Sequence, residues 1–186
     1  MKLIARILTA FIPFARARKR ARLLLVSWLY SRPVRSKAKS VGPGFRASAP
    51  TVVTRSTSIG RFVTSNGLAI HGEGAVSIGD YVQFGPETLI LSQNHNYEGR
   101  LLPYDWTYSA RGVEIGDCVW VGARATILPG AKIGEGAIIQ AGAVVHGEIP
   151  PCAIAGGNPA KVFAWRDKAH YAELKEKGMF LREVGI

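Results

Sequence analysis

Apolar residues return at every sixth position along the stretch from residue 115 to residue 155. The first set is aliphatic throughout and comprises Ile115, Val121, Ile127, Ile133, Ile139 and Val145. A second apolar residue follows each of these by four positions, in the set Val119, Ala125, Ala131, Ala137, Ala143 and Ile149. Six-residue spacing scatters side chains around an α-helix, because a helix turns about 100° per residue. In extended chain, steps of four and six both keep the same face, so the pattern predicts short strands with a common buried face.

Charged residues avoid these inward positions. The outward face instead carries Asp117, Arg124, Lys132, Glu135 and Glu148. The glycines at 116, 122 and 134 each follow an inward aliphatic residue, where we expect the backbone to turn a corner that residues with a Cβ resist. Short strands joined by corners at a period of six indicate a parallel β-helix.

The same register extends through the preceding part of the chain. It begins at Val41, Ala47, Val53 and Ile59, slips by one residue, and resumes at Val76, Ile78, Val82, Phe84 and Ile90. It disappears from Asn94 to Gly112, which predicts a loop extruded from the coil. We therefore predict a basic arm at 1–40, the β-helix at 41–162 with its loop at 94–112, and a helical cap at 163–186. Within that cap, Asp167–Lys177 has helical composition and Gly178 is a stop signal.

Positive charge is concentrated in the arm. The net charge is +11, and residues 1–72 hold 14 of the 24 Lys and Arg residues but no acid. The apolar residues of Lys2–Ile12 lie on one half of a helical projection, which predicts an amphipathic helix. We expect the arm to lie in a membrane interface with its cations facing anionic headgroups. The expected membrane-binding residues are Lys2, Arg6, Phe11, Arg16, Arg18, Lys19, Arg20, Arg22 and Trp28.

An alternative for the arm is a pair of helices that cap the open end of the solenoid. Its longest charge-free runs are nine residues, whereas a spanning helix needs about 20. Arg6 interrupts the apolar core that a signal peptide requires. Nucleic-acid binding is disfavoured, because aromatic residues are not interleaved regularly with the basic ones. The two cysteines, Cys118 and Cys152, fall on outward or corner positions in different turns, so we expect free, solvent-facing thiols.

The repeat, the sequence VWVG at 119–122 and the closing IPPCAIAGGNPAKV at 149–162 resemble the hexapeptide-repeat acyltransferases, in particular the maltose and galactoside acetyltransferase branch. The resemblance covers residues 41–162. It implies a mainly β fold, a left-handed parallel β-helix with three hexads per triangular turn, flanked here by the N-terminal amphipathic arm and a short C-terminal helix. The pattern itself does not give the hand, since about 98% of parallel crossovers are right-handed. The resemblance also implies acetyl-CoA or another acyl-CoA as co-substrate and a homotrimer with active sites between subunits.

The same resemblance assigns site residues. His95 closes the hexad 90–95 where the loop leaves the coil, and a histidine at this place is the general base of the family. An imidazole suits that task because its pKa lies near neutrality. Trp120 matches a tryptophan beside the thioester end of coenzyme A. The remaining matches are Ala123 and Ala141, small positions along the pantetheine arm, and Lys161, a basic position near the nucleotide phosphates.

Some family positions differ in this chain. A Thr-Lys pair that often contacts phosphate is His146-Gly147 here, and the family's assisting asparagine aligns with Ser65, one place before Asn66. The sugar-binding N-terminal segment of the maltose and galactoside enzymes is replaced by the basic arm, so the acceptor need not be a free sugar. The expected acceptor-binding residues are Asn66, Tyr97, Tyr104 and Trp106, with Tyr108 as a further aromatic residue of the loop.

These observations predict an acyl-CoA-dependent O-acyltransferase that acts on a sugar hydroxyl of a polysaccharide or lipid-linked glycan at the cytoplasmic face of the cell membrane. Direct transfer is favoured, because no serine or cysteine is placed beside a base. One alternative is a non-catalytic β-helix scaffold recruited to membranes. Another is a zinc enzyme like the β-helical carbonic anhydrases. It is disfavoured because His71 and His95, 24 residues apart, would not stack in a three-hexad turn. We therefore expect neither a metal nor a nucleic-acid partner.

Overall fold

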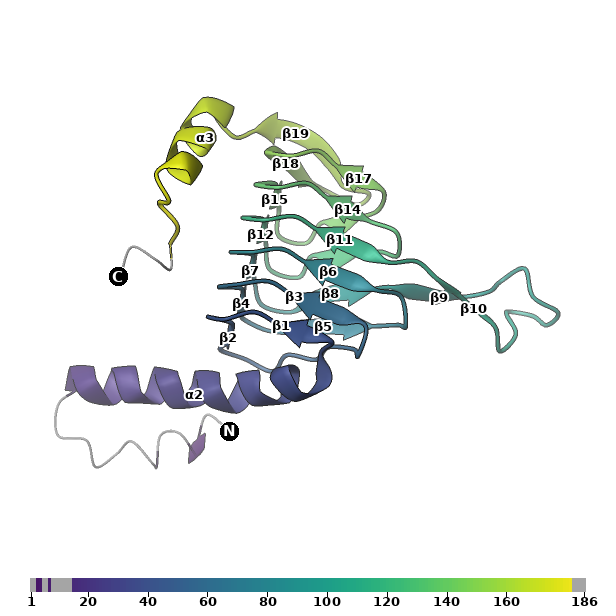
Figure 1. Ribbon diagram of the computed structural model, residues 1–186. Helices are drawn as coiled ribbons and strands as arrows, with labels where there is room; N and C mark the ends of the chain where they lie inside the picture. Colours follow the sequence, from purple (N-terminus) through teal and green to yellow (C-terminus); the bar gives the residue numbers. More distant parts are fainter. Residues whose placement is uncertain (1–2, 5–6, 8–14, 182–186) are drawn as a thin grey trace.

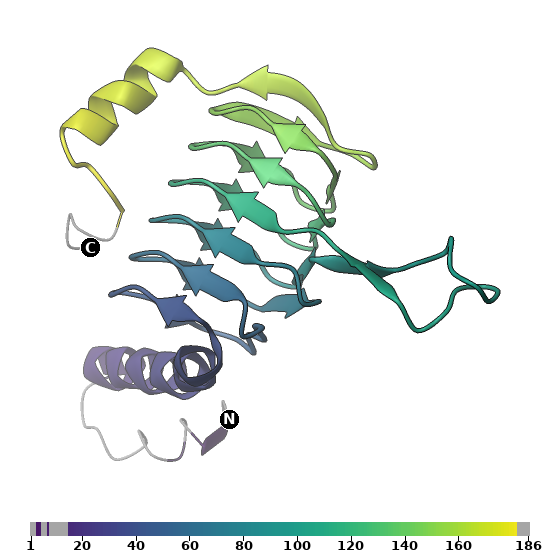
Figure 2. The same cartoon turned by 45° about the vertical axis from the view of Figure 1, so that its right-hand side comes forward.

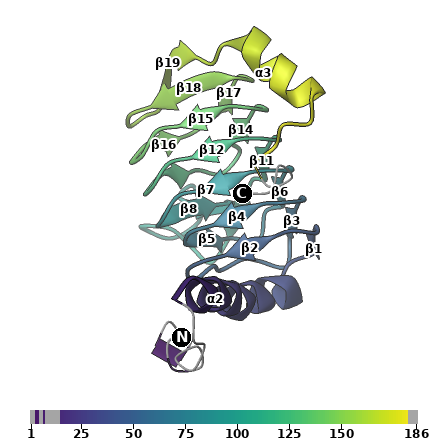
Figure 3. The same cartoon turned by 90° about the vertical axis from the view of Figure 1, so that its left-hand side faces the viewer.

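The computed structural model describes residues 3–4, 7 and 15–181, and it shows a coil of parallel strands flanked by two helices (Figure 1). Helix α2 (Ala15–Lys37) lies across the N-terminal end of the coil, and helix α3 (Lys168–Glu176) follows the last strand (Figures 1 and 3). Helix α2 is rich in arginine, alanine and leucine, which have high helix propensity. The chain is therefore a β-solenoid with helical additions at both ends.

Three sheets form the sides of the coil. The first sheet contains β1 (Ser40–Val41), β3 (Thr57–Ile59), β6 (Val76–Ile78), β11 (Val113–Ile115), β14 (Lys132–Ile133) and β17 (Glu148–Ile149). The second contains β2 (Arg46–Ala47), β4 (Thr64–Ser65), β7 (Gln83–Phe84), β12 (Trp120–Val121), β15 (Ile138–Ile139), β18 (Ala153–Gly156) and β19 (Lys161–Trp165). The third contains β5 (Leu68–His71), β8 (Thr88–Leu91), β13 (Thr126–Ile127) and β16 (Val144–Val145). Neighbouring strands are parallel except β18 and β19.

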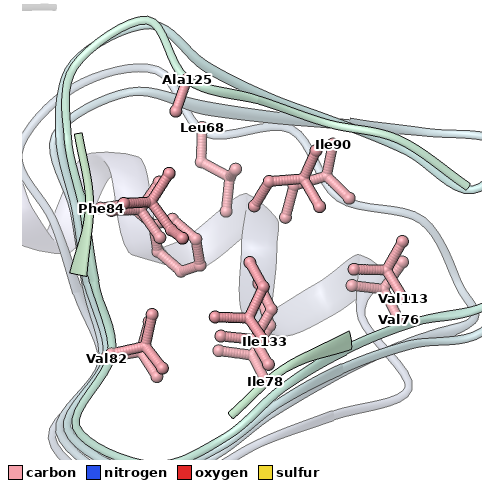
Figure 4. Packing of buried hydrophobic residues seen from close by; sticks show 14 of the residues in the cluster. Leu68, Val76, Ile78, Val82, Phe84, Ile90, Val113, Ala125 and Ile133 are labelled. Carbon is pink, nitrogen blue, oxygen red and sulfur yellow. The ribbon is translucent and has the colours of Figure 1, made fainter. Parts of the chain in front are cut away.

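The coil is left-handed. Figure 4 looks along the coil with α2 behind it, so the chain advances toward the viewer. In that view Val76, Ile78, Val82, Phe84 and Ile90 follow one another clockwise. A clockwise path toward the viewer is a left-handed screw. The left-handed parallel β-helix expected from the resemblance is confirmed.

The inward positions predicted from the six-residue period are confirmed. Both sets between residues 115 and 149 are buried, and so are Val76, Ile78, Val82, Phe84 and Ile90. A regular turn pairs Ile115 with Ile133, eighteen residues away. The preceding turns pair Ile59 with Ile78, nineteen residues apart, which is the predicted slip of one residue. The core is a column of aliphatic side chains inside the triangle (Figure 4).

The glycines at the corners have a different reason from the one expected. Gly122 and Gly134 do not have a left-handed φ, but a Cβ at either would lie 2.5 Å from a backbone nitrogen of the next turn, that of Ala141 or Pro151. The residues with a left-handed φ lie two positions after the corner glycines. Cys118 follows Gly116 with φ of 56°, and Arg124 follows Gly122 with φ of 57°. The glycines are therefore required by the close stacking of successive turns.

Helix α2 covers the N-terminal end of the core. Val34 is 1% exposed and joins the core cluster, and the backbone N–H of Ala47 donates to Ser31 Oγ at 2.9 Å. Residues 15–37 thus supply one helix of the two-helix cap that was the alternative for the arm, while membrane binding stays a prediction. Lys2, Arg6, Phe11 and the side chain of Arg16 lie outside the described residues, as does most of the predicted helix 2–12. Among the described helices, none combines the length and apolarity needed to cross a bilayer.

The predicted C-terminal helix is confirmed as α3. Asp167 caps it by accepting from the backbone N–H of His170 at 3.0 Å, and Gly178 follows its end with φ of 63°. None of its residues is buried, so α3 does not cover the core as α2 does. Its contacts run along one corner of the coil: Tyr171 Oη and Lys175 Nζ donate to Glu135 Oε1 at 2.9 and 2.5 Å. The segment beyond α3 runs back along the coil (Figure 2), and Phe180 stacks on Tyr81 with ring centroids 4.1 Å apart.

Both cysteines are free, as expected, but Cys152 is only 8% exposed rather than solvent-facing. Backbone hydrogen bonds place Gly136 on the turn between Cys118 and Cys152. The two cysteines are therefore two strand spacings apart, roughly 9.6 Å, which is too far for a disulfide. The C-terminal segment packs over this corner of the coil. The ring of Tyr171 lies against Gly136, and the backbone N–H of Arg166 donates to the carbonyl oxygen of Cys152. Burial also raises the pKa of the Cys118 thiol.

We predict that Gly122→Ala destabilises the coil, because the added Cβ meets backbone atoms that cannot rotate away. Overpacking of this kind costs about 1–3 kcal/mol. Chemical denaturation measures the loss. Arg124→Ala, at an exposed position in the same turn, is the control and should change stability little. Equal stability of the two variants would contradict the close-stacking explanation.

We predict that acid releases α3 from the coil. The hydrogen bond from Lys175 holds the pKa of Glu135 below its ordinary 4.5, and the contact with Glu135 raises the pKa of Lys175. The contribution of Glu135 is therefore present above its unfolded pKa and lost as pH falls through its lowered pKa. That of Lys175 is lost as pH rises through its raised pKa. Hydrogen exchange of 168–176 should show this. Glu135→Gln should already show faster exchange at neutral pH, and unchanged protection would contradict the assignment.

Candidate functional site

A two-stranded ribbon occupies the break in the repeat. Strands β9 (Gln93–His95) and β10 (Tyr108–Ala110) are antiparallel, with His95 opposite Tyr108 and Gln93 opposite Ala110. The ribbon leaves the coil between β8 and β11 and projects sideways from it (Figures 1 and 2). The expected loop is thus a hairpin with an ordered stem, and its register decides which side chains surround His95.

The imidazole of His95 is exposed but held between two aromatic rings. The ring of Tyr104 stacks on it with centroids 3.8 Å apart and an interplanar angle of 19°. The ring of Tyr108 lies at 4.7 Å with a tilt of 39°. Stacking of this kind orients the imidazole without occupying either ring nitrogen. The two tyrosine rings therefore fix the orientation of the His95 side chain.

The tip of the ribbon is ordered by Asp105. Its carboxylate accepts from the backbone N–H of Arg100 and of Thr107, each at 2.9 Å, and from the Thr107 hydroxyl at 2.5 Å. The Thr107 hydroxyl is the largest cause of the lowered pKa of Asp105. Tyr104 directly precedes this turn, so the hydrogen bonds of Asp105 fix the segment that carries the ring on His95.

A polar cleft of about 310 Å³ lies beside His95. Asn96, Glu98, Ser109 and Arg111 line it together with His95. The sequence analysis missed Glu98, Ser109 and Arg111, because only the pairing of β9 with β10 brings both ends of the break together. A cleft with carboxylate, hydroxyl, amide and guanidinium groups offers hydrogen bonds to a hydroxyl-rich molecule.

The predicted acceptor-binding residues are not gathered in one place. Tyr97 lines the cleft beside His95 and Tyr104 lies on the imidazole, whereas Trp106 is 83% exposed on the ribbon. Asn66 is exposed at the corner between β4 and β5 and accepts from Ser48 Oγ at 2.6 Å. Ser65 is fully buried and hydrogen-bonded to Thr51, so of the two candidates for the asparagine role only Asn66 is accessible.

The predicted coenzyme A residues share one region of the coil. Trp120 is 55% exposed on β12, in the middle of the second sheet. Ala123 and Ala141 lie one above the other at the corner that follows this sheet, where Gly142 N donates to Ala123 O. Lys161 is exposed at the start of β19, opposite Gly156. This surface lacks bulk along the corner, as an extended ligand would require.

Within one subunit, the surface assigned to coenzyme A lies far from His95. The corner with Ala123 and the ribbon leave opposite ends of the third sheet, as Figure 4 shows for Ala125 and Ile90. From Thr88 to His95 the strands run for seven residues, which is roughly 23 Å at 3.3 Å per residue. The candidate site is therefore in two parts within a subunit.

The remaining histidines do not add a metal centre. His71 lies in β5 opposite Leu91, and His146 and His170 are exposed on the coil and on α3. Within residues 3–4, 7 and 15–181, no group of three or more His, Cys, Asp or Glu side chains could hold a metal ion.

Comparison with known proteins agrees with this architecture. Residues 112–147 match the family described as bacterial transferase hexapeptide (six repeats). Putative acetyltransferase YvoF of Bacillus subtilis is 40% identical over 93 residues, which are 50% of this chain and 49% of that protein. Galactoside O-acetyltransferase of Escherichia coli is 35% identical over 117 residues, or 61% and 57% of the two chains. The chain thus spans about half the length of the curated relatives it matches.

Solved structures show the same fold. A galactoside acetyltransferase in complex with coenzyme A has a TM-score of 0.65 and 25% identity, covering 91% of this chain and 82% of that one. A maltose O-acetyltransferase from Clostridium difficile has a TM-score of 0.57 and 23% identity, covering 90% and 84%. Residues 112–147 thus match the bacterial transferase hexapeptide family, and the chain as a whole is similar in fold to the galactoside and maltose O-acetyltransferases.

Proposed function

We propose that the protein transfers an acyl group, in the first instance acetyl, from coenzyme A to a sugar hydroxyl. The observation that carries this proposal is His95, which is exposed, held by Tyr104 and Tyr108, and placed beside a polar cleft. The similar galactoside acetyltransferase was solved with coenzyme A, which supports coenzyme A as the acyl carrier here. Trp120, Ala123, Ala141 and Lys161 are the residues we assign to it.

In the proposed reaction His95 is the general base. Its neutral imidazole accepts the proton of the acceptor hydroxyl as the oxygen attacks the thioester carbonyl. The carbon–sulfur bond breaks when the tetrahedral intermediate collapses, and the imidazolium returns the proton to the thiolate. We take the transfer to be direct, because Cys118 has a raised thiol pKa and lies near α3, away from the ribbon. Ser109 lines the cleft with His95, but none of the hydrogen bonds in the described residues joins its hydroxyl to the imidazole. Asn66, Tyr97 and Trp106 are assigned to the acceptor side.

We further propose a homotrimer in which neighbouring subunits complete each site. The separation of His95 from Ala123 and Ala141 within one chain supports this arrangement. Trp120, Phe163 and Trp165 are large exposed side chains of the second sheet, and an interface would cover apolar surface of this kind. The ribbon of one subunit would then reach the coenzyme A surface of the next.

The acceptor is proposed to be a polysaccharide or a lipid-linked glycan at the cytoplasmic face of the cell membrane. The basic arm supports this location, since Arg18, Lys19, Arg20 and Arg22 lie on α2 together with Trp28, which is half exposed. Cations and an aromatic side chain on one helix suit an anionic membrane surface.

We predict that His95→Ala lowers kcat for acyl transfer roughly 100- to 10,000-fold, the usual contribution of a general base. The fold should be unchanged, because His95 is exposed and contributes nothing to the core. Thioester consumption with an acceptor present measures the effect. His170→Ala removes an exposed histidine from α3 and should retain full activity. An active His95→Ala enzyme would reject His95 as the base, and a wild-type chain that consumes no thioester would favour the non-catalytic scaffold.

We predict that two inactive variants restore each other when they are co-assembled. His95→Ala removes the base, and Ala141→Trp fills the exposed corner assigned to the pantetheine arm. In a mixed trimer, an intact His95 from one subunit meets an intact Ala141 from another, so activity returns. Light scattering should give the mass of a trimer. A monomer, or a mixture that stays inactive, would contradict the shared site.

A further inference from the structure

A groove separates α2 from the first turn of the coil. It has a volume of about 740 Å³, and its main lining residues are Leu24, Trp28, Arg32, Arg35, Phe45 and Arg46. We call it the α2 groove. Leu24, Trp28 and Arg32 follow one another at four-residue intervals and therefore share one face of α2. Phe45 is buried at its floor, and Arg46 is exposed on β2.

The groove is strongly positive. Its three guanidinium groups belong to a stretch, residues 1–72, that contains no acid, and none of the ion pairs in the described part of the chain includes them. Arg32 lies over the ring of Trp28 at 5.4 Å, and Arg35 lies over Phe45 at 5.9 Å. Arg35 also donates to the carbonyl oxygen of Phe45 at 3.4 Å. Guanidinium groups ordered in this way can bind phosphate through paired hydrogen bonds.

The groove also presents apolar side chains that are open to solvent. Leu24 and Trp28 are each 55% exposed, one turn apart on the helix. Two serines also line the groove: Ser27 is half-buried, and Ser31 is buried and accepts from the backbone N–H of Ala47. The groove thus offers cations at one end and apolar side chains at the other. Its occupant should carry a phosphate directly joined to a hydrocarbon portion.

Coenzyme A does not fit this position. Arg46 on β2 and Lys161 on β19 lie at opposite edges of the seven-stranded second sheet. Six strand spacings separate them, which is roughly 29 Å. The nucleotide phosphates assigned to the surface near Lys161 are therefore at the other end of the coil.

We propose that the α2 groove binds the phosphate headgroup of an anionic membrane phospholipid, with Leu24 and Trp28 against the start of its acyl chain. This inference rests on the membrane association within the proposed function and gives that association a specific site. Because α2 lies across the end of the coil (Figures 1 and 3), the bilayer surface would lie below that end. The ribbon with His95 would then project along the surface rather than away from it.

The test compares two pairs of substitutions that remove the same charge from the same end of the protein. Arg32→Gln with Arg46→Gln empties the groove of two cations. Lys39→Gln with Arg55→Gln removes two exposed cations of the first turn outside the groove. Flotation with vesicles of phosphatidylcholine and phosphatidylglycerol measures binding by the full chain. We expect the groove pair to lose about tenfold more affinity than the control pair, since it also loses charge-assisted hydrogen bonds.

Two soluble probes distinguish the source of the phosphate. Calorimetric titration with a short-chain phosphatidylglycerol below its micelle concentration should show binding to wild type and loss in the groove pair. Inorganic phosphate should bind far more weakly to both. Leu24→Ser, which leaves every cation in place, should weaken binding of the short-chain lipid without altering the thermal melting of the coil. Inorganic phosphate binding as tightly as the lipid would overturn the phospholipid assignment.

The outcomes also separate this inference from the proposed function. Equal losses of vesicle binding in both charge pairs would overturn the groove while leaving membrane association intact. A wild-type chain that fails to float would overturn both the groove and the membrane location. Acyl transfer to a water-soluble acceptor is measured independently of either result, because His95 and the coenzyme A surface lie outside the groove.

Discussion

Backbone contact between successive turns is the constraint on which the rest of the structure depends. Each turn stacks on the next at the spacing of paired strands, so the corner residues have room only where no side chain points at the neighbouring turn. Gly122 and Gly134 satisfy this requirement. The aliphatic column inside the triangle then excludes water along the whole coil. The small residues Ala123 and Ala141 belong to the same corners, so the surface assigned to coenzyme A is a consequence of how the coil is packed.

The sequence predicted the coil well because its signal is local and periodic. Every inward residue from Ile115 to Ile149 follows from the spacing of six and four, and the pairing of Ile59 with Ile78 explains the one slip. The hand of the coil needed the family resemblance, since the period is the same for either hand. The role of the corner glycines was mistaken, because the spacing between turns is a property of the stacked structure.

The surroundings of the site residues could not be predicted in the same way. Tyr108 lies on His95 because β9 and β10 pair in one register, and nothing in residues 94–112 repeats. Cys152 is buried by a segment that begins more than ten residues later. Likewise, the α2 groove joins residues of a helix to those of a strand across the end of the coil. Each of these depends on contacts between segments that the period does not relate.

The central claim is that the ribbon of one subunit brings His95 to coenzyme A held on the coil of another. A crystal structure of the protein with coenzyme A bound tests it most directly. The account predicts that the thiol lies within hydrogen-bond distance, or one water, of the imidazole of a neighbouring subunit's His95. It also predicts that the pantetheine arm follows the corner of Ala123 and Ala141. A thiol remote from every His95 in the assembly would contradict the account.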